Sequence, residues 1–209
     1  MAIEDKVLTR LAAEPREAIA PRIRDGDLLL CSGNDPFSRL IGAATKSPWT
    51  HVAFAWRWPD IGRIMVFEAV QQLGVRTVPL QTFLSQSSTG KKPYPGKIVL
   101  ARHQEFADAA GKPGSAAAKR LGDAAVDRLG DRFSGVEVAK IGARISIGRW
   151  ARKMPRSLGP RDEYICSEYV AKCFAAAGVT IAWDGLGFIA PCDFARDPNV
   201  KALARFRTK

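Results

Sequence analysis

Residues 51–70 read HVAFAWRWPDIGRIMVFEAV, and this stretch decides the fold. Two runs, 51–56 and 64–70, are rich in the β-branched and aromatic residues that strands favour, and Pro59 and Gly62 mark the connection between them. The pattern predicts an antiparallel β-hairpin. Because side chains alternate between the two faces of a strand, the register of this hairpin decides which residues meet.

The predicted hairpin brings two polar residues together on one face. A turn centred on residues 59–60 sets His51 opposite Glu68, and directly opposed side chains have Cβ atoms about 4.5–5.5 Å apart. A carboxylate at that distance can hold an imidazole N–H, and a buried carboxylate is tolerated when it is paired. The rest of the face is apolar: Ala53, Ala55, Ile64, Val66 and Val70. If the register slips by one or two residues, Glu68 lies at a solvated rim instead.

Cys166 falls in the first turn of a helix that we expect over residues 163–177, with Asp162 as N-cap. Helix N-terminal N–H groups and a nearby imidazolium favour the thiolate, and lower a cysteine pKa from about 8.5 toward roughly 3.5–7.5. The same N–H groups can face an oxyanion. The alternative is that Cys166 belongs to one buried helical stripe with Val170 and Cys173.

Length and composition favour an ordinary globular chain. The 209 residues are 46% hydrophobic and 25% charged, which suits a single domain over residues 1–209. Amphipathic spacing predicts an N-terminal helix over about residues 3–20. No charge-free stretch could span a bilayer, and Glu4 and Asp5 stand where a secretory signal needs cations, so we expect a cytoplasmic protein, peripheral to a membrane at most.

The net charge of +11 is concentrated in one part of the chain, a predicted helical basic insertion over about residues 104–162. Its stretch 139–161 has no acid and seven cations: Lys140, Arg144, Arg149, Arg152, Lys153, Arg156 and Arg161. We expect this stretch to bind an anionic membrane surface, the alternative being a merely solvated basic face. Nucleic acid is not an expected partner.

The remaining candidates have simpler interpretations. No two of the four cysteines form a CxxC pair, so each is judged as a thiol, and Cys31 and Cys173 are expected to be small buried hydrophobes. The other histidine, His103, is expected to be structural or exposed, and Asp27 is expected to form a turn. Phosphate loops, dinucleotide-binding glycine motifs, HExxH and GxSxG are all absent.

A cysteine at a helix start, a histidine on a strand and an acid on the next strand are the parts of a thiol hydrolase. Here they come in the order His51, Glu68, Cys166, which is permuted relative to papain. The chain resembles the permuted papain-like, NlpC-type cysteine amidases that include the YiiX/YebB-like group. The resemblance rests on six segments: Gly26-Asp27-Leu28-Leu29-Leu30, Ser47-Pro48-Trp49-Thr50-His51-Val52, Phe67-Glu68-Ala69, Gly74-Val75, Cys166-Ser167-Glu168 and Ala190-Pro191-Cys192-Asp193-Phe194.

The resemblance implies an α+β, circularly permuted papain-like (NlpC-type) fold, with a small antiparallel sheet and packed helices. It makes Cys166 the nucleophile, His51 the general base and acid, and Glu68 the residue that orients His51. The implied reaction is cleavage of an amide bond through a thioester acyl-enzyme, with no cofactor and no metal. The substrate that the resemblance implies is an amide or ester in a cell-wall peptide, a protein or a lipid.

Two alternative functions stay open: a thiol-dependent lipid acyltransferase or esterase, and a non-catalytic basic module that binds membranes. The chain departs from the family pattern in two places. The stretch 104–162 is longer and more basic than the family core needs, and Cys192 stands where a small residue is expected.

Overall fold

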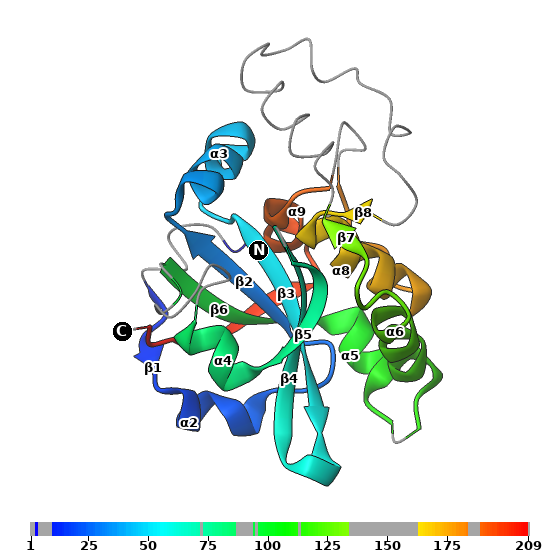
Figure 1. The fold of residues 1–209 in the computed structure, drawn as a ribbon. Coiled ribbons are helices and arrows are strands. Elements are labelled where there is room, and N and C mark those ends of the chain that lie inside the picture. The colour runs from blue at the N-terminus through cyan, green and yellow to red at the C-terminus, as the bar shows by residue number, and fades with distance from the viewer. Residues whose placement is uncertain are drawn as a thin grey trace.

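The computed structural model describes residues 3, 10–71, 73–86, 94, 96–112, 114–133, 163–183 and 189–208, and these form a mixed α+β fold on one seven-stranded sheet (Figure 1). The strand order is β1-β9-β6-β2-β3-β4-β5, and all neighbours are antiparallel except β1 and β9. The predicted α+β class is confirmed. The strands are β1 (Ala13–Glu14), β2 (Leu28–Gly33), β3 (His51–Trp58), β4 (Arg63–Val70), β5 (Gly74–Pro79), β6 (Gly96–His103) and β9 (Val200–Phe206).

Helices cover both faces of the sheet, and a short second sheet lies beside it. The helices are α2 (Arg16–Ile19), η1 (Ala20–Arg22), α3 (Pro36–Thr45), η2 (Pro59–Ile61), α4 (Leu80–Ser85), α5 (Gln104–Ala110), α6 (Ala116–Val126), α8 (Cys166–Ala176) and α9 (Pro191–Arg196). The second sheet pairs β7 (Arg132–Phe133) with β8 (Glu163–Tyr164) in parallel.

Alternation along the strands supplies two apolar cores. Leu28 and Leu30 of β2 face one core, which α5, α6, α8 and α9 cover, while Leu29 and Cys31 face the other, which α2 and α4 cover. All four side chains are fully buried. Because both faces are covered, β2 is a continuous apolar run rather than an alternating one.

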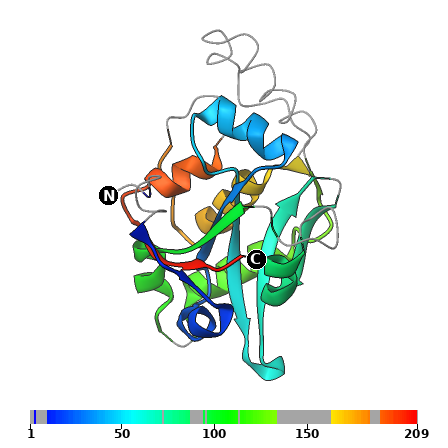
Figure 2. The ribbon, with the colours of Figure 1, turned by 90° about the vertical axis from the view of Figure 1, so that its left-hand side faces the viewer.

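Part of the helix predicted over about residues 3–20 falls on residues 4–9, which lie outside the described residues, and from Ala13 onward the structure differs from the prediction. Ala13 and Glu14 instead form β1, which pairs with the C-terminal strand β9, and the first and last described strands lie side by side at the sheet edge (Figure 2). Pro15 follows at the N-cap of α2. Proline lacks an N–H and restricts the residue before it to extended conformations, so helix α2 starts only after Pro15.

The basic insertion is described only in part. Residues 104–133 contain α5, α6 and β7, and the N-cap Ser115 of α6 accepts from the N–H of Ala117 at 3.2 Å. The rest of the predicted insertion, including the basic stretch 139–161, lies outside the described residues.

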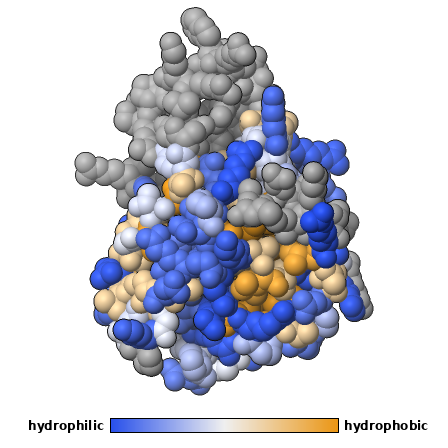
Figure 3. Space-filling model, turned by 180° about the vertical axis from the view of Figure 1, so that it is seen from behind, coloured by the Kyte–Doolittle hydropathy of each residue, from blue (hydrophilic) through white to orange (hydrophobic). Residues whose placement is uncertain are grey.

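Polar side chains dominate the described part of the surface that is seen from behind. Figure 3 shows the rear of the molecule as hydrophilic around a limited apolar area. Few large apolar side chains of the described residues are exposed: Trp58, Ile61, Leu73, Val126 and Leu129. Among the described residues, no helix is long and apolar enough to cross a membrane.

Candidate functional site

The hairpin brings His51 and Glu68 together, although its register differs from the prediction. Phe54 pairs with Phe67, so every partner in β4 is shifted by two residues and Glu68 lies diagonal to His51. The turn is centred later than expected because Gly62, at φ 61°, closes the short helix η2. A two-residue shift keeps each side chain on its face, and diagonal neighbours remain within reach of long side chains. His51 Nε2 lies 2.9 Å from Glu68 Oε2.

Glu68 has a second partner that the sequence analysis missed. Arg76 of β5 faces it directly in the β4–β5 ladder, and directs both Nε, at 2.9 Å, and Nη2, at 2.7 Å, to Glu68 Oε1. The two carboxylate oxygens are thus divided between an imidazole and a guanidinium. Glu68 is only 2% exposed, so the solvated-rim alternative is wrong. The signal was available: a tight turn before Gly74 sets residues 68 and 76 opposite each other.

Cys166 lies in the first turn of its helix, as predicted, but α8 starts at Cys166 itself, three residues later than expected. Glu163 and Tyr164 are held extended by pairing with β7, and Ile165 is the N-cap, whereas the predicted cap Asp162 lies outside the described residues. The buried Ser167 hydroxyl donates to the Ile189 carbonyl at 2.7 Å. That bond ties the start of α8 to the segment before α9.

Three groups surround the Cys166 sulfur. The His51 ring and the backbone N–H groups of Val52 and Ser167 lie close enough to it to lower the pKa of the thiol. The β3–β4 ladder begins at Phe54, and nearer the start of β3 the Val52 N–H turns to Cys166. Because His51 Nε2 is held by Glu68, the ring nitrogen left for the thiol is Nδ1.

The charges of these groups support one another. Burial alone would raise the pKa of the Cys166 thiol, but His51 and the two N–H donors outweigh it, and the pKa is lowered. Burial opposes a charge on His51, yet Cys166 and Glu68 raise its pKa to about 10. Burial is likewise outweighed at Glu68, whose pKa is lowered by His51 and Arg76. The arrangement therefore favours a thiolate, an imidazolium and a carboxylate.

Aromatic rings form one wall of the site. The His51 ring stacks on Phe83 of α4 with a centroid distance of 6.4 Å and an interplanar angle of 29°. Phe83 in turn stacks on Tyr94 at 6.4 Å. An aromatic face beside an imidazolium restrains the ring and favours its positive charge.

The other three cysteines are buried free thiols without this environment. Burial raises the pKa of Cys173 to about 12. Burial also raises the pKa of Cys31 and, with Asp193 beside it, that of Cys192. The predicted role of Cys31 and Cys173 as small buried hydrophobes agrees with their place in the two cores.

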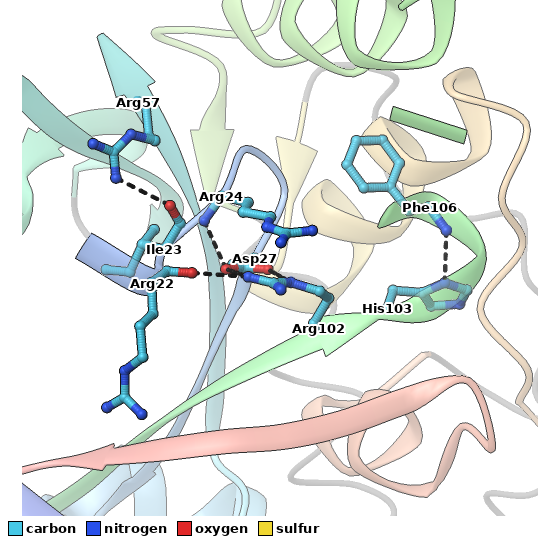
Figure 4. Close-up of polar contacts among 8 residues, drawn as sticks. All are labelled: Arg22, Ile23, Arg24, Asp27, Arg57, Arg102, His103 and Phe106. Carbon is cyan, nitrogen blue, oxygen red and sulfur yellow. Dashed lines mark hydrogen bonds and ion pairs between the residues drawn. The ribbon is translucent and has the colours of Figure 1, made fainter. Parts of the chain in front are cut away.

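His103 and Asp27 belong to the framework of the fold (Figure 4). His103 is 1% exposed and caps α5, because its Nδ1 accepts from the Phe106 N–H at 3.3 Å. Burial lowers the pKa of His103. Asp27 does shape the turn, accepting from the Arg24 N–H at 2.8 Å, but it also binds Arg102 through both oxygens at 2.7 Å.

Among the described residues, no group of three or more His, Cys, Asp or Glu side chains could hold a metal ion. The triad itself fits a metal poorly, because Arg76 already occupies Glu68 Oε1 and places a positive charge beside it. His51 occupies the other oxygen.

Comparison with known proteins supports the fold. No family model matches the chain, and no curated protein matches its sequence. Among solved structures, the chain is similar to the crystal structure of metalloprotein yiiX from Escherichia coli O157:H7, with a TM-score of 0.55 and 18% identity over 87% of this chain and 97% of that one. At this identity the similarity shows a shared YiiX-like fold. It leaves the chemistry to the residues of this chain.

Proposed function

We propose that this chain is a cysteine hydrolase of the permuted papain-like, NlpC-type class, in one domain, that cleaves an amide bond through a thioester. The observation that carries the proposal is the buried contact series from Cys166 at the start of α8 through His51 to Glu68, with 2.9 Å between the last two side chains. A nucleophile, its base and a group that orients the base are what covalent acyl transfer requires.

In the proposed reaction, His51 holds the proton of Cys166, and the thiolate attacks the substrate carbonyl carbon. A carbon–sulfur bond forms and the carbonyl oxygen becomes an oxyanion, which backbone N–H groups at the start of α8 can stabilise. His51 then gives its proton to the amine, which leaves as the carbon–nitrogen bond breaks. Water, losing a proton to His51, attacks the thioester and releases a carboxylic acid and the thiol. Glu68 keeps the imidazole oriented throughout.

The first test of the proposal is selective alkylation. At pH 6 a thiol with pKa about 8.5 is less than about 1% ionised, so neutral iodoacetamide should modify Cys166 at least about tenfold faster than Cys31, Cys173 or Cys192. Peptide mass spectrometry measures the four rates. His51→Ala should remove most of the low-pH rate, whereas His103→Ala, a second buried histidine, should leave it unchanged.

The second test follows the covalent step. An activated ester should leave an acyl group on Cys166 that intact-mass spectrometry detects and hydroxylamine removes, and Cys166→Ala should show none. In the alkylation test, the proposal is refuted if modification of Cys166 rises only near pH 8.5 and does not depend on His51. Cys166 would then be an ordinary buried thiol of the helical stripe. A panel of cell-wall peptide, protein amide and lipid substrates then defines the substrate class.

A further inference from the structure

Arg76 contacts neither Cys166 nor His51 through a described hydrogen bond, yet it holds the residue on which His51 depends. Its Nε and Nη2 converge on Glu68 Oε1 at 2.9 and 2.7 Å, which leaves Oε2 for His51. We propose that Arg76 is a positioning residue that keeps Glu68 ionised and aimed at His51, and so sets the lowest pH at which Cys166 is reactive. This inference rests on the proposed hydrolase function.

Glu68 needs such a partner because it is buried. A buried carboxylate is costly unless it is paired, and it can be neutralised by taking up a proton. With a neutral Glu68, the His51 imidazolium loses one of its two anionic partners and gives up its proton more readily, so the Cys166 thiolate loses the positive charge that stabilises it. An imidazolium can itself give up its proton, whereas a guanidinium keeps its charge over the whole working pH range. Arg76 therefore supplies a charge that does not titrate.

The β4–β5 ladder makes this contact specific. Glu68 and Arg76 are directly opposed, and opposite charges in that relation favour the pair. β5 is the edge strand of the sheet, and the Arg76 side chain is 27% exposed against 3% for Glu68. The Arg76 guanidinium thus stays partly hydrated while it neutralises the Glu68 carboxylate, which is shielded from water.

The other titratable groups near Glu68 do not replace Arg76. His51 reaches it from β3, Cys31 acts on it from β2, and Cys166 lies beyond His51 on α8. The two thiols can add only negative charge. α4 has no titratable side chain, and on β7, beside β5, Arg132 is exposed. α8, which packs on β4, also carries Glu168 and Lys172, but the groups that lower the pKa of Glu68 are His51 and Arg76.

Loss of the cation should move the pH profile of Cys166 without abolishing its reactivity. An opposite charge at hydrogen-bond distance typically lowers a carboxyl pKa by about 1–3 units, so Arg76→Met should let Glu68 protonate at higher pH. The acid limb of Cys166 alkylation should then rise by about one pH unit. Above that limb Glu68 is ionised in both proteins, so the plateau rate should stay within about twofold of the unmodified protein.

The experiment measures iodoacetamide alkylation of Cys166 from pH 4.5 to 8 in the full chain, with Arg76→Met, Arg76→Gln and Arg76→Lys compared. We expect both neutral variants to shift the acid limb upward and Arg76→Lys, which keeps the charge, to restore it. Arg76→Gln retains hydrogen-bond donors, and it replaces Arg76→Met as the neutral variant if Arg76→Met is not cooperatively folded.

Three results would overturn the inference. The first is that the acid limb of Cys166 alkylation does not move in Arg76→Met or Arg76→Gln. The second is that it moves equally in Arg76→Lys, and the third is that the plateau rate falls without a shift in pH. The second and third are expected if Arg76 acts only through packing. Failure of the hydrolase proposal looks different: the unmodified protein itself would then show no His51-dependent alkylation at low pH.

Discussion

Asp27, just before β2, and Glu68, on β4, are both buried carboxylates, each 2% exposed and each bound to an arginine. Asp27 gives both oxygens to Arg102, in two contacts of 2.7 Å. Glu68 gives one oxygen to Arg76 and the other to His51. The paired arginine is therefore common to both sites. The two sites differ because Glu68 keeps one oxygen for a titratable partner, His51, whereas Asp27 gives both oxygens to Arg102.

The difference separates a framework contact from a candidate active site. Arg102 and the Arg24 N–H satisfy Asp27 within the framework, where the same guanidinium also donates to the Arg22 carbonyl at 2.9 Å. A buried ion pair of this kind fixes geometry and does not by itself indicate function. At Glu68 the interaction continues through an imidazole to a thiol, and that extension makes the site chemically interesting.

The two histidines repeat the contrast. Both are largely buried, but His51 has a pKa raised to about 10 by Cys166 and Glu68 despite burial, whereas burial lowers that of His103. Asp197 lies 3.9 Å from His103 Nε2, too far for a hydrogen bond. Burial alone favours the neutral ring, and only close anionic partners reverse it.

Asp27→Asn should have the largest effect on stability. It leaves the Arg102 side chain, 15% exposed, without its counterion, and breaking a buried pair in this way costs about 3–5 kcal/mol. Urea denaturation monitored by circular dichroism measures the loss. The rate of Cys166 alkylation in the folded protein should stay within about twofold of the unmodified chain, because Asp27 belongs to a separate ion pair. A large fall in the alkylation rate would show that the Asp27–Arg102 pair and the Cys166 site are not independent.

Glu68→Gln is the matched change at the site, and it should affect reactivity more than stability. Arg76 is more exposed than Arg102 and can be hydrated, so the stability loss should be smaller than for Asp27→Asn. Alkylation of Cys166 at pH 6 should fall about tenfold, because a neutral amide stabilises the imidazolium poorly. Peptide mass spectrometry at fixed reagent gives the rate. If Glu68→Gln loses as much stability as Asp27→Asn and its alkylation rate does not change, Glu68 has only a framework role, like Asp27.

Part of the site was predictable because side chains alternate between the faces of a strand, so an error of two residues in the register leaves each side chain on its predicted face. The predicted hairpin register is wrong by two residues, yet His51 and Glu68 stay on one face and in contact. A shift of one residue would have separated them. Local sequence also explains the start of α3, where Asp35 directly precedes Pro36 and accepts from the Ser38 N–H at 3.0 Å.

What the sequence did not predict depends on contacts between distant residues. Ala13 and Glu14 form a strand because they meet residues 205 and 206, which no local helical periodicity reveals. Helix α8 begins at Cys166 because residues 163–164 pair with β7. Arg76 is different, since Glu68 and Arg76 are linked by a short hairpin, and extending the strand-pairing argument to the next turn would have found it.

The smallest expected effect concerns the pH dependence of stability. His103 has a lowered pKa when folded, so below its unfolded value near 6.5 the unfolded chain binds the proton more readily, and this residue makes stability fall as pH falls. One proton contributes a slope of at most about 1.4 kcal/mol per pH unit. His103→Asn keeps an N-cap acceptor for α5 and removes the titration. Urea denaturation at pH 5, 6, 7 and 8 should therefore show a shallower acid-side decline for this variant and an unchanged slope above pH 7, with Cys166 alkylation unaffected. Parallel stability curves would mean that His103 titrates alike in both states, and would remove the contrast between the two histidines.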